Sequence, residues 1–163
     1  TAAELATSLT SLCPTESSVL LENLLRSEAF DLFTQSAVAY LLSRTSALQL
    51  QPDEQLFAEG DAGSSMFFIL TGVIGLRLTT MELPSLTTGA LFGEMSMLQG
   101  SPRSATAYAL EPTVLLEVPA EVVEDADSDF RAVLFELISR TLMERLQHSN
   151  QFVSSIEEAE VVD

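Results

Sequence analysis

The chain has 163 residues, 47% of them hydrophobic, and carries 24 acidic residues against 7 basic ones, a formal net charge of −17. This length and apolar content suit one globular domain with a substantial core, and no apolar run is long enough to cross a membrane. The acidic balance argues against a nucleic-acid-binding surface, which needs clustered Lys and Arg. We therefore expect no nucleic-acid partner, and membrane contact only through an attached domain.

The only cysteine, Cys13, cannot form an internal disulfide, which is typical of a reducing, cytoplasmic compartment. The chain starts with Thr1 rather than Met, so we expect it to be a piece of a longer protein. We expect a single domain over residues 1–163, and its host could be a bacterial channel or transporter.

Residues 1–46 form a predicted N-terminal helical segment, because apolar residues recur there at helical spacing. They are Leu20, Leu21, Leu24, Leu25, Phe30, Phe33, Val38, Leu41 and Leu42. We expect these side chains to pack on the rest of the domain.

Residues 47–118 have the pattern of short strands separated by Gly and Pro turns. Strands are predicted at 48–50, 66–70, 73–78, 105–110 and 113–118. Residues 59–63 form a predicted turn, and residues 82–88 a loop or a hairpin. Short strands at this spacing favour a compact barrel or jelly roll, with mostly β structure and flanking helices.

Residues 119–156 return to a helical pattern, with Asp127, Ser128 and Asp129 as N-terminal signals. An apolar stripe follows, made of Phe130, Val133, Leu134, Leu137, Ile138, Leu142 and Leu146. Such a stripe is typical of core packing or of a helix–helix contact, so a homodimer through the C-terminal helix is one expectation. Residues 157–163 form an acidic tail that we expect to fray.

Residues 92–106 contain one acid, Glu94, and one base, Arg103, in a stretch from Leu83 to Leu110 that has no other charge. This pattern predicts a pocket for a small ligand with a hydroxyl and an anionic group. Arg103 offers a planar fork for two phosphate oxygens, and Glu94, as an acceptor, suits a sugar hydroxyl.

The residues around this pair can complete an anion site. Gly93 lets the backbone approach a ligand closely. A short helical turn from Glu94 presents free amides to an anion. Ser104 adds a hydroxyl donor and Ala105 an amide donor. The only histidine, His148, leaves no metal cluster and no catalytic triad, so we expect neither an enzyme nor a bound metal or cofactor.

The sequences FGEMSML at 92–98 and PRSAT at 102–106 resemble the phosphate-binding cassette of cyclic nucleotide-binding domains. That family includes the regulatory subunits of protein kinase A, the catabolite activator protein and cyclic-nucleotide-gated channels. The turn at 59–61 and the strand pair at 66–73 also resemble the entry to the family's β-roll. The resemblance covers about residues 30–150 and implies an eight-stranded, jelly-roll-like β-roll with N-terminal helices, a short cassette helix and C-terminal helices.

The resemblance also implies roles for single residues. Arg103 would pair with the cyclic phosphate and Glu94 would accept from the ribose 2′-hydroxyl. The implied contacts from the rest of the cassette are Gly93, Met95, Ser104 and Ala105.

In the family, a residue of the C-terminal helix often caps the base. Arg145 is the candidate here, with Leu142 and Leu146 as apolar alternatives, and an equally open interpretation makes Arg145 a solvated residue of the helix face.

Threonine after the cassette arginine favours cGMP in the kinases of the family, so Ser104 mildly favours cAMP over cGMP. The predicted function is a cyclic nucleotide sensor that regulates an attached or partner protein. A potassium channel, a sulfate-permease-type or other transporter, and a stand-alone sensor are open as hosts. The alternative function is a degenerate domain that binds no nucleotide and acts as a structural or dimerisation module.

Overall fold

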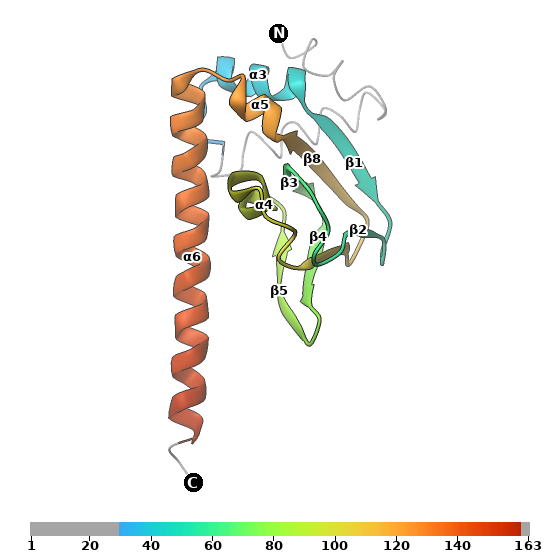
Figure 1. The fold of residues 1–163 in the computed structure, drawn as a ribbon, viewed down its shortest axis with the longest axis vertical. Coiled ribbons are helices and arrows are strands. Elements are labelled where there is room, and N and C mark those ends of the chain that lie inside the picture. The colour runs from blue at the N-terminus through green and yellow to red at the C-terminus, as the bar shows by residue number, and fades with distance from the viewer. Residues whose placement is uncertain (1–29, 161–163) are drawn as a thin grey trace.

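A computed structural model describes residues 30–160, and the side chains of residues 30–150. Within that range the chain forms four helices and eight strands, in the arrangement of Figure 1. Their bounds are α3 (Gln35–Arg44), β1 (Ser46–Leu50), β2 (Gln55–Phe57), β3 (Ser65–Thr71), β4 (Val73–Leu78), β5 (Met81–Thr87), β6 (Leu91–Phe92), α4 (Glu94–Gln99), β7 (Thr106–Ala109), β8 (Thr113–Pro119), α5 (Ala120–Glu124) and α6 (Ser128–Glu160). Cys13, most of the predicted N-terminal helical segment and the end of the predicted tail lie outside the described residues.

The strands form two four-stranded antiparallel sheets, with the orders β1-β8-β3-β6 and β2-β7-β4-β5. The predicted class, mostly β with eight strands and flanking helices, is confirmed. Strand β5 pairs with β4, so residues 82–88 contribute to a hairpin rather than to a loop. Pro84 is tolerated there because β5 lies at the edge of its sheet.

Strand β3 separates two hydrophobic cores, because its side chains alternate between its two faces. Phe67 and Ile69 face the other sheet and pack with residues such as Ile74 of β4. Met66 and Phe68 face the helices instead and join the second core. That core also contains Val38, Leu41 and Leu42 of α3, Val122 and Val123 of α5, and Phe130, Leu134, Leu137 and Ile138 of α6. Burial on both faces explains why β3 reads as an uninterrupted apolar run.

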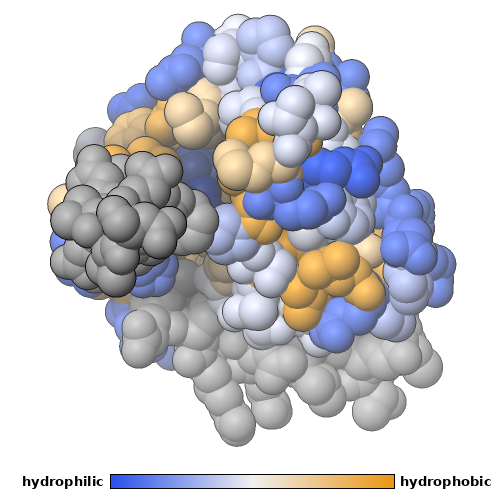
Figure 2. Space-filling model, turned by 90° about the horizontal axis from the view of Figure 1, so that it is seen from below, coloured by the Kyte–Doolittle hydropathy of each residue, from blue (hydrophilic) through white to orange (hydrophobic). Residues whose placement is uncertain are grey.

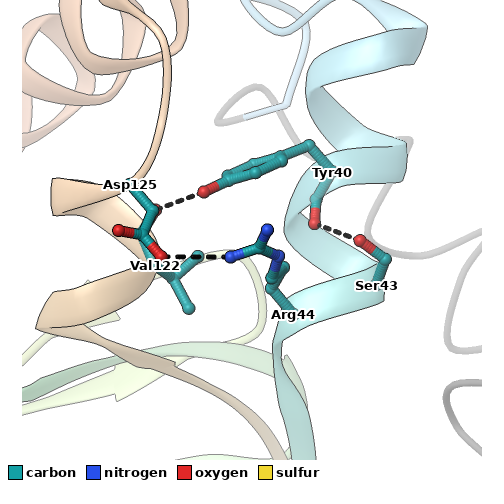
Figure 3. A network of polar contacts seen from close by, with 5 residues as sticks. All are labelled: Tyr40, Ser43, Arg44, Val122 and Asp125. Atoms are coloured by element: carbon teal, nitrogen blue, oxygen red, sulfur yellow. Dashed lines mark hydrogen bonds and ion pairs between the residues drawn. The ribbon is translucent and has the colours of Figure 1, made fainter.

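Helices α3 and α5 are joined by polar contacts at the edge of the helical core (Figure 3). The Tyr40 hydroxyl donates to the carbonyl oxygen of Val122 at 2.8 Å. Arg44 and Asp125 form an exposed ion pair at 3.2 Å. These contacts fix the short helix α5 between the β-roll and the start of α6.

Helix α6 has 33 residues, a length of about 50 Å at 1.5 Å per residue. It stands along one side of the β-roll, with α4 on the side of the roll that faces it (Figure 1). Its N-terminal part is anchored by buried side chains such as Leu134 and Ile138, whereas Met143 and Leu146 are exposed. The helix continues through Glu160, so part of the predicted tail is helical. Among the described residues, no helix is both long and apolar enough to span a membrane.

The face at the hairpin end of the β-roll is mainly hydrophilic, and its hydrophobic side chains lie in separate patches (Figure 2). The exposed large hydrophobic residues of the described chain include Met81, Leu110 and Met143. Scattered exposure of this kind is ordinary for a globular domain.

Candidate functional site

A pocket lies between the cassette helix α4, the loop that precedes β7, and helix α6. Its cavity volume is about 70 Å³, and it is partly open to solvent. Its lining residues are Phe57, Leu76, Phe92, Gly93, Glu94, Met95, Ser96, Arg103, Ser104, Ala105 and Arg145. The structure therefore brings the seven candidate site residues, which are up to 52 positions apart in sequence (93 to 145), to one pocket.

Two glycines set the position of α4. Gly93 precedes the helix with φ +79°, and Gly100 follows it with φ +62°, both in the left-handed region that disfavours side chains. A Cβ on Gly93 would also lie 2.8 Å from Nη1 of Arg103. We predicted that the backbone at Gly93 would approach a ligand closely; in the structure it approaches the side chain of Arg103 closely.

Arg103 is a buried cation at the wall of the pocket, with only 5% of its surface exposed. Its Nη1 donates to the carbonyl oxygens of Ser65, at 2.8 Å, and Gly93, at 3.2 Å. The guanidinium lies 4.3 Å from the centroid of the Phe57 ring, a cation–π distance. These contacts fix the plane of the guanidinium before any ligand is considered.

The electrostatic environment of Arg103 is unfavourable to its charge. Burial lowers the pKa of the guanidinium, and Glu117 and Asp61 oppose that change only in part. An arginine stays protonated under ordinary conditions, so the charge remains inside the protein. Its Nε is buried and has no hydrogen-bond partner in the described structure. A buried donor of this kind is costly unless a polar group completes it.

The backbone of Gly63 packs directly beside that donor. A Cβ at this position would lie 2.5 Å from Nε and 2.6 Å from Nη2 of Arg103. The backbone amide of Arg103 donates to the carbonyl oxygen of Asp61 at 2.8 Å, which ties the 59–63 turn to the cassette. The sequence marked this turn only by its composition, so the role of Gly63 beside Arg103 was missed.

Glu94 is the second buried charge of the pocket, with 2% of its surface exposed. Its Oε1 accepts from Nη1 of Arg145 at 3.0 Å. Nη2 of Arg145 also donates to the carbonyl oxygen of Leu91. The sequence placed both side chains near a ligand but did not predict that they contact each other, because no local pattern links α4 to α6.

The other candidate residues lie at the rim or floor of the pocket. Met95 is 42% exposed, and Ser104 is exposed beside the buried Arg103. Ala105 is buried. Phe57, which packs against Arg103, was not predicted, since a single aromatic residue in a three-residue strand gives no periodic signal.

Comparison with protein families matches residues 47–128 to the cyclic nucleotide-binding domain. The chain belongs to the cyclic nucleotide-binding domain family. The matched range covers the β-roll, the cassette and the start of α6. The domain is therefore a cyclic nucleotide-binding regulatory domain rather than a catalytic one.

Curated relatives of this cyclic nucleotide-binding domain are larger proteins. A cGMP-dependent protein kinase of Eimeria tenella is 28% identical over 125 residues, which cover 77% of this chain and 12% of the kinase. The Pycsar effector protein PaPycTIR of Pseudomonas aeruginosa is 27% identical over 135 residues, 82% of this chain and 44% of the effector. The chain thus spans less than half of either relative.

Solved structures match the domain over most of its length. A cyclic nucleotide-binding domain from Methylobacillus flagellatus superposes with a TM-score of 0.73 at 26% identity, covering 84% of this chain and 82% of the other. The catabolite activator protein of Thermus thermophilus gives a TM-score of 0.67 at 25% identity, with 80% and 63% covered. These matches agree with the β-roll and helix arrangement described above.

Proposed function

We propose that this domain is a sensor for a cyclic nucleotide, with cAMP as the favoured ligand, and that it regulates an attached or partner protein. The observation that carries the proposal is the buried, incompletely bonded guanidinium of Arg103 in the same pocket as the buried carboxylate of Glu94. A cyclic nucleotide has a phosphate for the first group and a sugar hydroxyl for the second.

The phosphate would lie at the Nε and Nη2 side of Arg103. Nη1 is already engaged by the carbonyl oxygens of Ser65 and Gly93, so it is the less available nitrogen. The backbone of Gly63 packs against Nε and Nη2, where a Cβ would lie 2.5 and 2.6 Å away, so the absence of a side chain at Gly63 lets these two nitrogens keep their place. Phosphate oxygens there would complete the buried donor and compensate the cost of burying the cation. Ser104 and the amide of Ala105 lie next to Arg103 and can add further donors.

We infer the base of the nucleotide from the relatives and from Ser104. Relatives include cGMP-dependent kinases and also the cAMP-dependent protein kinase regulatory subunit of Candida albicans, which is 26% identical over 100 residues. These relatives support a purine cyclic nucleotide without selecting one. Ser104, in place of the threonine that favours cGMP in the related kinases, supports cAMP. We also place the domain in the cytoplasm, free or attached to a channel or transporter, and a homodimer through α6 stays part of this proposal.

Calorimetric titration with cAMP and with cGMP tests the proposal, with Arg103→Lys as the informative variant. Lysine keeps the charge but lacks the planar fork, so one or two charge-assisted hydrogen bonds are lost. At about 1.5–3 kcal/mol each, we expect the dissociation constant to rise about 10-fold to 100-fold or more. Arg44→Lys, at an exposed ion pair on α3, is the matched control and should bind like the wild type.

Two results would overturn the proposal. The first is a folded wild-type protein that gives neither heat nor a thermal shift with either nucleotide at millimolar concentration, as a non-binding structural module would. The second is an Arg103→Lys variant that binds with wild-type affinity.

A further inference from the structure

Arg145 ties helix α6 to the β-roll through two contacts. Beyond the buried Ile138, Leu142 is half-buried and still packs on the helical core, whereas Met143 and Leu146 are exposed. Arg145 lies between these two exposed residues, but its side chain is only 34% exposed and crosses to the roll. There it donates to Glu94 on α4 and to the carbonyl oxygen of Leu91 on β6.

The partner that Arg145 contacts is the acceptor that the proposed function assigns to the ligand. Glu94 has 2% of its surface exposed, and its Oε1 is already bonded at 3.0 Å to Nη1 of Arg145. A guanidinium–carboxylate bond has charge on both partners, whereas a sugar hydroxyl brings none. A ligand hydroxyl must therefore replace a stronger partner on Glu94 or share the carboxylate with it.

We propose that Arg145 acts as an internal competitor for the nucleotide. In this role, which rests on the proposed function, the guanidinium of Arg145 holds Glu94 and lowers the affinity of the pocket for a ligand that carries a ribose hydroxyl. Occupation of Glu94 by the ligand releases Arg145, and α6 then loses the contacts that Arg145 makes with Glu94 and with the carbonyl oxygen of Leu91. The same competition would make ligand binding and release of α6 thermodynamically coupled.

A competitor and a residue that caps the base have opposite effects on nucleotide affinity. A capping arginine adds a contact to the bound ligand, so its removal weakens binding. A competing arginine opposes the ligand, so its removal strengthens binding. Coupling between two sites is commonly about 5-fold to 150-fold in affinity. We therefore expect Arg145→Ala to lower the dissociation constant for the nucleotide about 10-fold, and Arg145→Lys, which keeps one charged donor, to fall between that variant and the wild type.

The control variant is Arg140→Ala. Arg140 lies on the same helix, but its guanidinium pairs with Glu136 of that helix and not with the pocket. We expect this variant to bind with wild-type affinity. Calorimetry with cAMP and cGMP on the four proteins therefore separates the loss of the contact with Glu94 from a general effect of removing a charge from α6.

Amide hydrogen exchange without nucleotide gives an independent readout of the contact. Exchange of the backbone amides at 139–150 should become faster in Arg145→Ala and stay unchanged in Arg140→Ala. Equal or weaker nucleotide binding by Arg145→Ala than by the wild type would overturn the competitor role. Nucleotide binding by Arg145→Ala but not by the wild type would support the competitor role strongly.

Binding by neither the wild type nor Arg145→Ala would overturn the proposed function, and the competitor role with it. Exchange would still report whether Arg145 anchors α6, so an absent binding site is distinguished from an absent anchor.

Discussion

Replacing Gly63 with alanine perturbs Arg103 without removing it. The added Cβ would lie 2.5 Å from Nε and 2.6 Å from Nη2 of Arg103, closer than real Cβ contacts allow. The guanidinium cannot retreat freely, because Nη1 is bonded to Ser65 and Gly93 and its face packs on Phe57. Overpacking of this kind costs about 1–3 kcal/mol of folding free energy. We expect a fall in Tm of about 2–4 °C per kcal/mol for a domain of this size.

We expect Gly63→Ala to weaken nucleotide binding as well as to lower stability. A displaced guanidinium loses at least one charge-assisted bond to the phosphate, worth about 1.5–3 kcal/mol. The dissociation constant should then rise about 10-fold to 150-fold, since each 1.4 kcal/mol is a factor of ten. Calorimetry at a temperature well below the Tm of the variant measures this change on folded protein.

Gly75→Ala supplies a matched clash elsewhere in the β-roll. A Cβ on Gly75 would lie 2.6 Å from Cζ of the partly exposed Tyr108, which does not line the pocket. This variant should lose stability by a similar mechanism and keep its affinity for the nucleotide. A folded Gly63→Ala protein with wild-type affinity would refute the assignment of the phosphate to the Nε and Nη2 side of Arg103.

Two further predictions concern the helical core and the charge of the chain. Tyr40→Phe removes the donor to the carbonyl oxygen of Val122 and should lower the free energy of unfolding by about 1 kcal/mol, measured by urea denaturation; an unchanged urea midpoint would contradict this role of the hydroxyl. Raising ionic strength from about 0.01 to 0.1 M shortens the Debye length from about 30 to 10 Å. Because the net charge of −17 repels an anionic ligand and the contact with Arg103 is buried, calorimetry should show affinity rising with salt; a fall would indicate that exposed cations dominate binding.

The sequence predicted the elements whose signals are local. Strand β3 was recognised because five consecutive apolar residues, buried on both faces, give a strong pattern. The cassette was recognised because Glu94 and Arg103 stand alone in an uncharged stretch. Strands β2 and β6 were missed because three and two residues show no periodicity, and they are strands only through their pairing with β7 and β3.

The partners of the buried charges could not be predicted, because they depend on tertiary contacts. The sequence predicted only that Arg103 pairs with an anion. In the folded protein, Arg103 also donates to two backbone carbonyl groups and packs on Phe57. Gly63 matters for the same reason. Its missing side chain has meaning only beside a guanidinium 40 positions away in sequence (63 to 103). Residue types thus predicted the ligand chemistry, and the fold determines which atoms remain available for it.

Arg145 shows how a correct location can leave the role of a residue undecided. It lies seven residues, about 10 Å of helix, beyond the buried Ile138 (138 to 145), so a tilt of α6 by about 10° about that anchor would move it by about 2 Å. A displacement of that size is enough to break a 3.0 Å hydrogen bond to Glu94. A competitor requires α6 to move away from the pocket when the nucleotide binds, whereas a residue that caps the base requires it to move closer. Only one of the two roles can dominate. An increase in affinity in Arg145→Ala would therefore mean that α6 moves away from the pocket when the ligand binds, and a decrease would mean that it moves closer.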